Sequence, residues 1–217
     1  MRAHRLTLLA AIAFVLTAQA LWAENAPELL LEPAGRVARS RALLPGERRL
    51  RPIQINTAAL TGAPQRLSLS LFDDIQLTAV ISRVSMGGAG SRCYSGTIEG
   101  IAHSQVTLSL NGTALSGMIT APGRGTFAIQ SAPENRHEVV ETDPGKFMPP
   151  KVLVKKPSVQ AAPRQAASRA TALVDVMVVY TQSVLDGAGG LPGVNSLIDI
   201  AISDANTVLT NSQIDVQ

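Results

Sequence analysis

The sequence predicts an α+β chain with two parts. The first is an antiparallel β-rich region over residues 51–143, expected to fold as a small sandwich or open barrel. It is predicted by short runs in which apolar and polar residues alternate, and by the turn residues between those runs. The second part, from residue 171, is an incomplete α/β unit that opens with a strand, a helix and a further strand. It is predicted by a continuous apolar run followed by an amphipathic helical pattern.

The N-terminus has the three parts of a secretory signal peptide. Arg2 and Arg5 supply positive charge, residues 6–16 are apolar, and small residues follow as far as Ala20 and Ala23. The alternative is a membrane anchor, but the apolar stretch is shorter than the ~20 residues that a span needs. We expect cleavage near Ala20 or Ala23, a secreted or periplasmic location and no stable membrane span.

The charge balance argues against a nucleic-acid partner. The formal net charge is +3, but without Arg2 and Arg5 the chain holds 17 basic residues against 16 acidic ones. Nucleic-acid binding needs a clustered basic face, which a nearly neutral mature chain does not offer.

After the signal peptide of residues 1–23, residues 24–50 form a leader of mixed character. Its prolines and arginines predict irregular structure with a short helix at most. The arginines are Arg36, Arg39, Arg41, Arg48 and Arg49.

The β-rich region, residues 51–143, reads as an antiparallel meander. A turn is expected at Asp73-Asp74, and a glycine-rich loop at 87–90 separates the first runs from the rest. Asn111-Gly112 is the strongest hairpin signal, because both central positions of such a turn need positive φ. The alternating runs lie at Ile53–Ile55, 67–71, 77–81, 94–100, 106–110, 115–120, 127–130 and 137–141.

Residues 144–170 form a basic Pro/Ala linker. Prolines and like charges keep such a segment extended. Two readings that do not exclude each other are an interdomain tether and a processing site cut after a basic residue. The residues that define it are Pro144, Pro149, Pro150, Pro157, Pro163, Lys151, Lys155, Lys156, Arg164 and Arg169.

The last segment, residues 171–217, predicts the start of a βαβ unit. The run 173–180 suits a strand buried on both faces. A glycine loop then leads to a helix, which Ser196 and Asp199 are expected to cap, and a new strand begins at Ile214. The helix carries its apolar stripe at Val194, Leu197, Ile198, Ala201, Ile202, Ala205 and Leu209.

The single cysteine, Cys93, excludes an internal disulfide. Its alternatives are pairing with another chain, a reactive thiol, a thiolate that blocks a zinc ion, and a small half-buried hydrophobe on a strand. The last of these is the expectation.

No catalytic, cofactor-binding or metal-ligating residue can be assigned in this chain. His103 and His137 have no second histidine at ligand spacing and are expected on the surface, solvated or hydrogen-bonded. Gly187-x-Gly189 lacks the third glycine of a dinucleotide fingerprint and is expected in a flexible loop. The G-x-S-x-G and H-E-x-x-H motifs are both absent.

Two stretches resemble the secreted reprolysin-like bacterial zinc metallopeptidases, the metzincin group that includes peptidyl-Asp metalloendopeptidase. The first runs from Tyr94-Ser95-Gly96 to residues 137–141 and is similar to their pro-region, with tyrosine where a tryptophan is expected. The second is 174–181, with Ala201, Asn206, Asn211-Ser212 and Ile214 at the family's spacing.

The resemblance implies a precursor whose pro-region assists folding or blocks the active site, and whose zinc is held by H-E-x-x-H-x-x-G-x-x-H. Because this chain has no such motif, we expect an N-terminal fragment that is inactive alone and holds no cofactor. Its expected partners are the missing C-terminal catalytic portion or a protein substrate of the full-length enzyme. The alternative is a stand-alone exported β-domain that binds or inhibits another protein.

Overall fold

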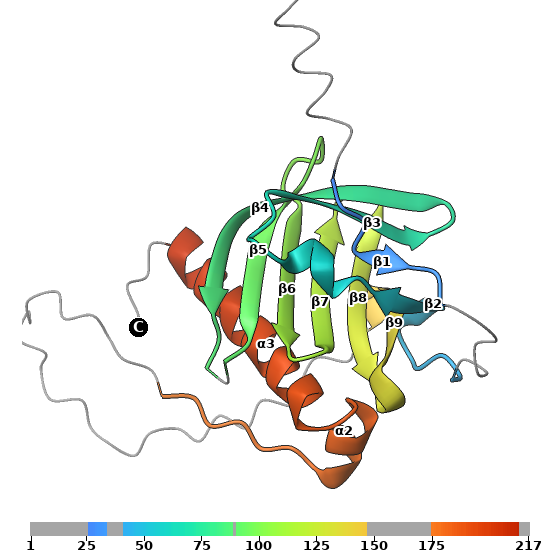
Figure 1. Cartoon of the computed structure of the whole chain (residues 1–217), viewed down its shortest axis with the longest axis vertical. Coiled ribbons are helices and arrows are strands. Elements are labelled where there is room, and N and C mark those ends of the chain that lie inside the picture. Colours follow the sequence, from blue (N-terminus) through green and yellow to red (C-terminus); the bar gives the residue numbers. More distant parts are fainter. Residues whose placement is uncertain (1–25, 34–40, 89, 147–174, 213–217) are drawn as a thin grey trace, which may run out of the picture.

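A computed structural model describes residues 26–33, 41–88, 90–146 and 175–212. Its main feature is one antiparallel sheet of nine strands, curled into a nearly closed barrel (Figure 1). The strand order is β1-β2-β9-β8-β7-β6-β5-β4-β3. The strands are β1 (Leu30–Leu31), β2 (Glu47–Ile55), β3 (Arg66–Phe72), β4 (Ile75–Met86), β5 (Arg92–Ile98), β6 (Gln105–Asn111), β7 (Ala114–Ala121), β8 (Gly125–Ala132) and β9 (Arg136–Thr142).

Short 3₁₀ helices and two α-helices complete the described part. The 3₁₀ helices are η1 (Thr57–Leu60), η2 (Pro133–Asn135) and η3 (Pro144–Lys146). The α-helices are α2 (Gln182–Gly187) and α3 (Leu191–Asn211), and α3 lies across the outside of the barrel (Figure 1). Neither α-helix has the length and hydropathy that crossing a bilayer requires.

The meander follows from strict alternation along each strand. On β3, Leu67, Leu69 and Leu71 are fully buried while the serines between them are only partly so. Successive residues of a strand point to opposite faces, so one set of side chains fills the barrel interior. The prediction of a β-rich antiparallel fold is confirmed, and of the two expected architectures the structure has the barrel.

Aromatic side chains fix the barrel interior. The rings of Phe72 and Phe127 lie 6.3 Å apart, a distance at which tilted rings attract. Tyr94 is fully buried, and its hydroxyl donates to the carbonyl of Leu60 at 2.9 Å. That bond satisfies the only polar atom that this side chain brings into the core.

The N-terminal segment closes the barrel between β2 and β3. The amide of Leu29 donates to the carbonyl of Ser68 on β3, and the amide of Asn56 donates to the carbonyl of Leu29. Leu29 and Leu30 are 0% and 2% exposed, so they belong to the core. The structure therefore places strands, and no described helix, in the 24–50 stretch that we expected to be irregular.

The described arginines of that leader, Arg41, Arg48 and Arg49, form ion pairs at or beside β9. Arg41 donates to both carboxylate oxygens of Glu47 at 2.6 and 2.7 Å, and this hydrogen bonding lowers the pKa of Glu47. Arg49 pairs with Glu141 at 2.6 Å, and its guanidinium carbon lies 4.2 Å from the centre of the Phe72 ring. These charges join β2 to its neighbours and are not free for a polyanion.

The Asn-Gly hairpin is present, but its turn is shifted by one residue. Asn111 pairs with Ala114 in the ladder, so the two turn residues are Gly112 and Thr113. Of these only Gly112 has positive φ, at 60°. Asn111 thus serves as a strand residue, where the sequence pattern predicted a turn residue.

Two predictions for the last segment are wrong. Residues 175–180 are extended but pair with no described strand, and Val176 and Met177 are 66% and 88% exposed rather than buried. Helix α3 begins at Leu191 with Gly190 as its N-cap residue, so Ser196 and Asp199 do not cap it. The linker expected at 144–170 and the strand expected at Ile214 lie mostly or entirely outside the described residues.

Candidate functional site: the interface between the barrel and helix α3

Helix α3 packs across β5, β6, β7 and β8 on their outer face (Figure 1). That face is polar because it carries the alternate residues of strands whose apolar residues fill the barrel. Ser109 and Ser116 lie on it and are fully buried, as is Ser196 on the helix. The site is therefore a contact made by small polar side chains.

The centre of the interface is a pair of serines. The hydroxyls of Ser116 on β7 and Ser196 on α3 lie 2.5 Å apart. Ser196 also donates to the carbonyl of Gly193, one turn earlier in the helix, at 2.9 Å. Buried hydroxyls without partners are costly, so these bonds are a condition of the close packing.

Towards the β4–β5 turn, the interface is built around Asp199. One carboxylate oxygen accepts from the amide of Gly88 at 3.1 Å, and the other accepts from the hydroxyl of Ser91. Asp199 is 5% exposed and Ser91 is fully buried. Hydrogen bonds to a charged acceptor are the stronger kind, each worth about 1.5–3 kcal/mol.

Gly87 makes room for this carboxylate. A Cβ at Gly87 would overlap both the Asp199 carboxylate and the Ser91 hydroxyl, whereas a Cβ at Gly88 would lie 4.0 Å from the nearest Asp199 oxygen. The glycine-rich stretch 87–90 is thus part of the docking surface. The sequence identified it only as a separator between strands.

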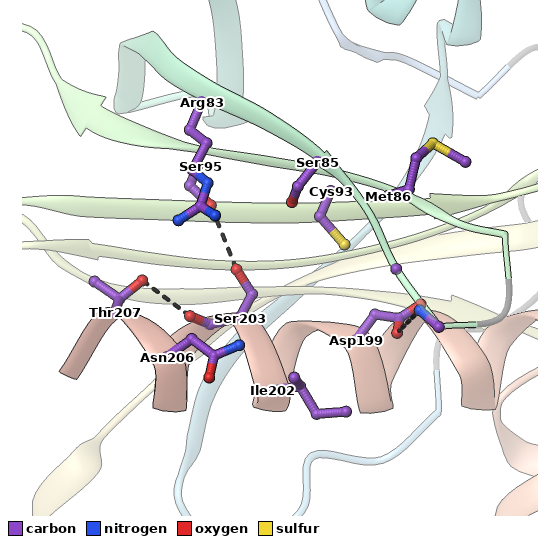
Figure 2. Close-up of a pocket in the computed structure, with 12 residues that line it drawn as sticks. Arg83, Ser85, Met86, Cys93, Ser95, Asp199, Ile202, Ser203, Asn206 and Thr207 are labelled. Carbon is purple, nitrogen blue, oxygen red and sulfur yellow. Dashed lines mark hydrogen bonds between the residues drawn. The ribbon is translucent and has the colours of Figure 1, made fainter. Parts of the chain in front are cut away.

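A second carboxylate secures the C-terminal half of the helix. Asp204 accepts from Gln105 at 3.0 Å and from Thr107 at 2.7 Å, both on β6. The hydroxyls of Ser95 on β5 and Ser203 on α3 lie 3.4 Å apart, a contact drawn as a dashed line in Figure 2. Asp199 and Asp204 therefore attach the helix at different points of the sheet.

The turn between α2 and α3 packs against the end of β8. The Ser131 hydroxyl donates to the carbonyl of Ala188 at 3.2 Å. Gly189, with φ of 77°, leaves no room for a Cβ beside the Ala132 carbonyl, and Gly193 is equally tight against Ala188. Gly187 and Gly189 thus end a helix and form a packed turn, which corrects the expectation of a flexible loop.

A pocket of about 260 Å³ lies beside this contact, between β4, β5 and α3 (Figure 2). Cys93 is 3% exposed, and its thiol contacts the Ser109 hydroxyl at 3.7 Å. Figure 2 shows its sulfur pointing from β5 towards the helix. The cysteine is on a strand as expected, but it is fully buried rather than half-buried.

The opposite face of α3 carries the apolar stripe. With the extended residues 175–180 it bounds a groove of about 540 Å³ in which no charged side chain takes part. Leu197 and Ile202 are each 42% exposed. The groove is lined by Val176, Val178, Val179, Tyr180, Thr181, Val184, Val194, Leu197, Ile198, Ala201, Ile202 and Ala205.

The two histidines considered as ligands lie in different settings. His103 is exposed in the turn before β6, with φ of 57°. His137 on β9 is 3% exposed, and its Nε2 accepts from the Leu115 amide at 3.0 Å. Burial lowers the pKa of His137 to about 4, against a backbone hydrogen bond at Asn135 that raises it.

His137 is therefore a neutral buried side chain, and the expectation of a surface histidine was wrong for it. Asp74, in the expected β3–β4 turn, pairs with Arg49 at 2.7 Å, and that hydrogen bond lowers the pKa of Asp74. Within the ranges that the structure describes, no three His, Cys, Asp or Glu side chains converge as a metal site would require.

Comparison with known proteins adds no identification. The chain matches no family model, no curated protein and no solved structure.

Proposed function

We propose that the barrel is the pro-region of a secreted zinc metalloendopeptidase precursor, and that α3 is the first helix of the enzyme domain. The observation that carries this proposal is the asymmetry of α3. Its polar face is bonded to the barrel, while no element within the described ranges covers the groove between its apolar stripe and residues 175–180.

Residues 175–180 have the character of a strand from the interior of a sheet. Met177 is 88% exposed and does not line the apolar groove, whereas Val176, Val178, Val179 and Tyr180 do line it. A strand that is apolar on both faces is normally covered on both, as in α/β sheets with helix layers. This supports the idea that residues 175–212 begin a second domain.

The barrel contributes to such a precursor by holding the helix on its polar side. Association there does not compete with burial of the apolar stripe, so the enzyme sheet can form against α3 while the barrel stays bound. This arrangement supports assistance to folding more directly than obstruction of an active site. The zinc ligands and the catalytic glutamate would come from sequence outside this chain, so we expect no peptidase activity from this chain alone.

The test starts from the transcript that encodes the chain. The reading frame beyond the codon for Gln217 is predicted to contain H-E-x-x-H-x-x-G-x-x-H. The product of that frame is then folded with and without residues 26–146. Zinc-dependent, chelator-sensitive casein hydrolysis that requires the barrel during folding is the expected result. A frame without the motif, or equal activity without the barrel, contradicts the proposal.

A second candidate is a stand-alone exported β-domain that binds or inhibits another protein. The observation in its favour is that the apolar core of the barrel is complete without the C-terminal segment. A stable mature product of this chain alone, captured with a bound partner from the secreted fraction, would favour this candidate.

A further inference from the structure

The barrel and the C-terminal unit, defined as residues 175–212, keep separate apolar interiors. The connected core of the barrel runs from Leu29 to Val139 and includes no residue of the C-terminal unit. On α3 only Val194 and Ile200 are buried apolar side chains at 3% and 7% exposure. The two bodies therefore do not share a hydrophobic core that would make them one folding unit.

The contact between the two bodies is instead made of directed hydrogen bonds. It has three anchor points: the Asp199 carboxylate in the β4–β5 turn, the Ser116–Ser196 pair, and the Asp204 carboxylate on β6. All the partner atoms of the two carboxylates belong to the barrel. Such a pattern specifies register along the helix more than it contributes apolar burial.

We propose that the outer face of β5–β7, together with the β4–β5 turn, is a binding surface for the polar face of a helix, and that the barrel and the C-terminal unit form a separable non-covalent complex. The partner that fits is a helix with Ser and Asp at positions 196, 199, 203 and 204 and an apolar opposite face. The helix stays bound after the connecting segment is cut.

This inference deepens the proposed function and rests on it for the nature of the partner, since it states how a pro-region would hold the first helix of an enzyme. It also carries a regulatory consequence. Cleavage between the two bodies does not by itself release the barrel, so release needs a second event that breaks the carboxylate contacts.

The experiment uses the full mature chain with a specific protease site inserted within residues 147–174. After complete cleavage, the two pieces are applied to size exclusion with light scattering, and their dissociation constant is measured by dilution. We expect co-elution at micromolar concentration. Separation of the wild-type pieces under those conditions overturns the proposal.

The variants test which face of the helix carries the binding. Asp199→Ala and Asp204→Ala each remove a carboxylate that accepts two barrel hydrogen bonds, so each is expected to weaken association by about tenfold or more. Leu197→Ser and Ala205→Ser, both in the outward groove and exposed, are the matched controls and should change it by less than about twofold. A larger effect from the controls than from the aspartate variants overturns the proposal.

A check of barrel stability separates a weakened contact from a destabilised barrel. The thermal transition of the barrel, followed by circular dichroism, must be unchanged in each variant. If Asp199→Ala fails this check, Asp204→Ala alone decides the outcome. The proposed function is tested on different material, since a missing zinc motif in the transcript leaves this association measurement untouched.

Discussion

The carboxylate of Asp199 on α3 lies where a side chain at Gly87, in the β4–β5 turn, would begin. The carboxylate is held there by Gly88 and Ser91, in residues that precede it by more than a hundred positions. A turn that looks like a simple connector is thereby part of an interface.

Gly87→Ala should undock the N-terminal half of α3 while leaving the barrel folded. The added methyl displaces the Asp199 carboxylate from the two hydrogen bonds that it accepts. This weakens the docking of α3 on the barrel by about 2–3 kcal/mol. Hydrogen exchange of the α3 amides measures the effect. Gly88→Ala is the matched control, because its Cβ would lie 4.0 Å from Asp199, an ordinary contact. Equal protection of the α3 amides in Gly87→Ala and Gly88→Ala would argue against the contact between Gly87 and Asp199.

His137 should make the barrel less stable in mild acid. Its pKa is lowered from 6.5 to about 4 in the folded chain. Between pH 6.5 and 4 the imidazole is therefore protonated in the unfolded state and neutral in the folded state. The contribution of neutral His137 is fully present above pH 6.5 and is lost as the pH falls towards 4, up to about 3 kcal/mol.

Urea unfolding at a series of pH values from 7.5 to about 4 measures this contribution. His137→Gln should show a flatter profile than the wild type over that range, because the carboxylate contributions are common to both proteins. Parallel profiles would mean that the imidazole is protonated in the fold.

Leu197→Ser should cost less stability than Ile200→Ser. Leu197 is 42% exposed on the outward face of α3, whereas Ile200 is 7% exposed against the barrel. Burial of an aliphatic side chain is worth roughly 1.5–3 kcal/mol, so the inward substitution is the costly one. Chemical unfolding followed by α3 helicity gives both values. The outward variant should also bind less of an apolar fluorescent dye. The reverse order of costs would place the apolar stripe against the barrel.

Limited trypsin digestion should cut first between Lys151 and Arg169, a stretch rich in prolines and basic residues. Arg66, Arg92 and Arg124 provide trypsin targets within the barrel, so the comparison is internal to the molecule. Mass spectrometry of the early fragments identifies the sites. Early cleavage at the barrel arginines, with the linker spared, would show that the expected domain boundary is wrong.

The strands were predictable because their signal is local. Leu67, Leu69 and Leu71 alternate with serines, and burial on one face alone reproduces that alternation. The closure of the barrel by Leu29 and Leu30 was not predictable, because two adjacent apolar residues are too few to show a periodicity. Their role depends on contacts with both β2 and β3, which are distant in the sequence.

The interface was not predictable for a different reason. Ser196 and Asp199 sit at a spacing that also fits a helix cap, and nothing local distinguishes the two roles. Of their partners, Ser116 lies on the face of the sheet that alternation marks as solvent-facing, and Ser91 lies in the β4–β5 turn. Recognising a polar face as a docking surface required the position of the helix. The same holds for His137, whose Nε2 accepts from the Leu115 amide on β7, two strands away in the sheet.

The most direct test of the account is an engineered disulfide between the barrel and the inward face of α3. The hydroxyls of Ser116 and Ser196 lie 2.5 Å apart, so cysteines at these positions are within bonding reach. In a Cys93→Ser background, Ser116→Cys with Ser196→Cys should form the bond under mild oxidation, while Ser116→Cys with Leu197→Cys should not. Peptide mapping under non-reducing conditions detects the cross-link. Bonding at 197 and none at 196 would show that the apolar stripe faces the barrel, and would contradict the account.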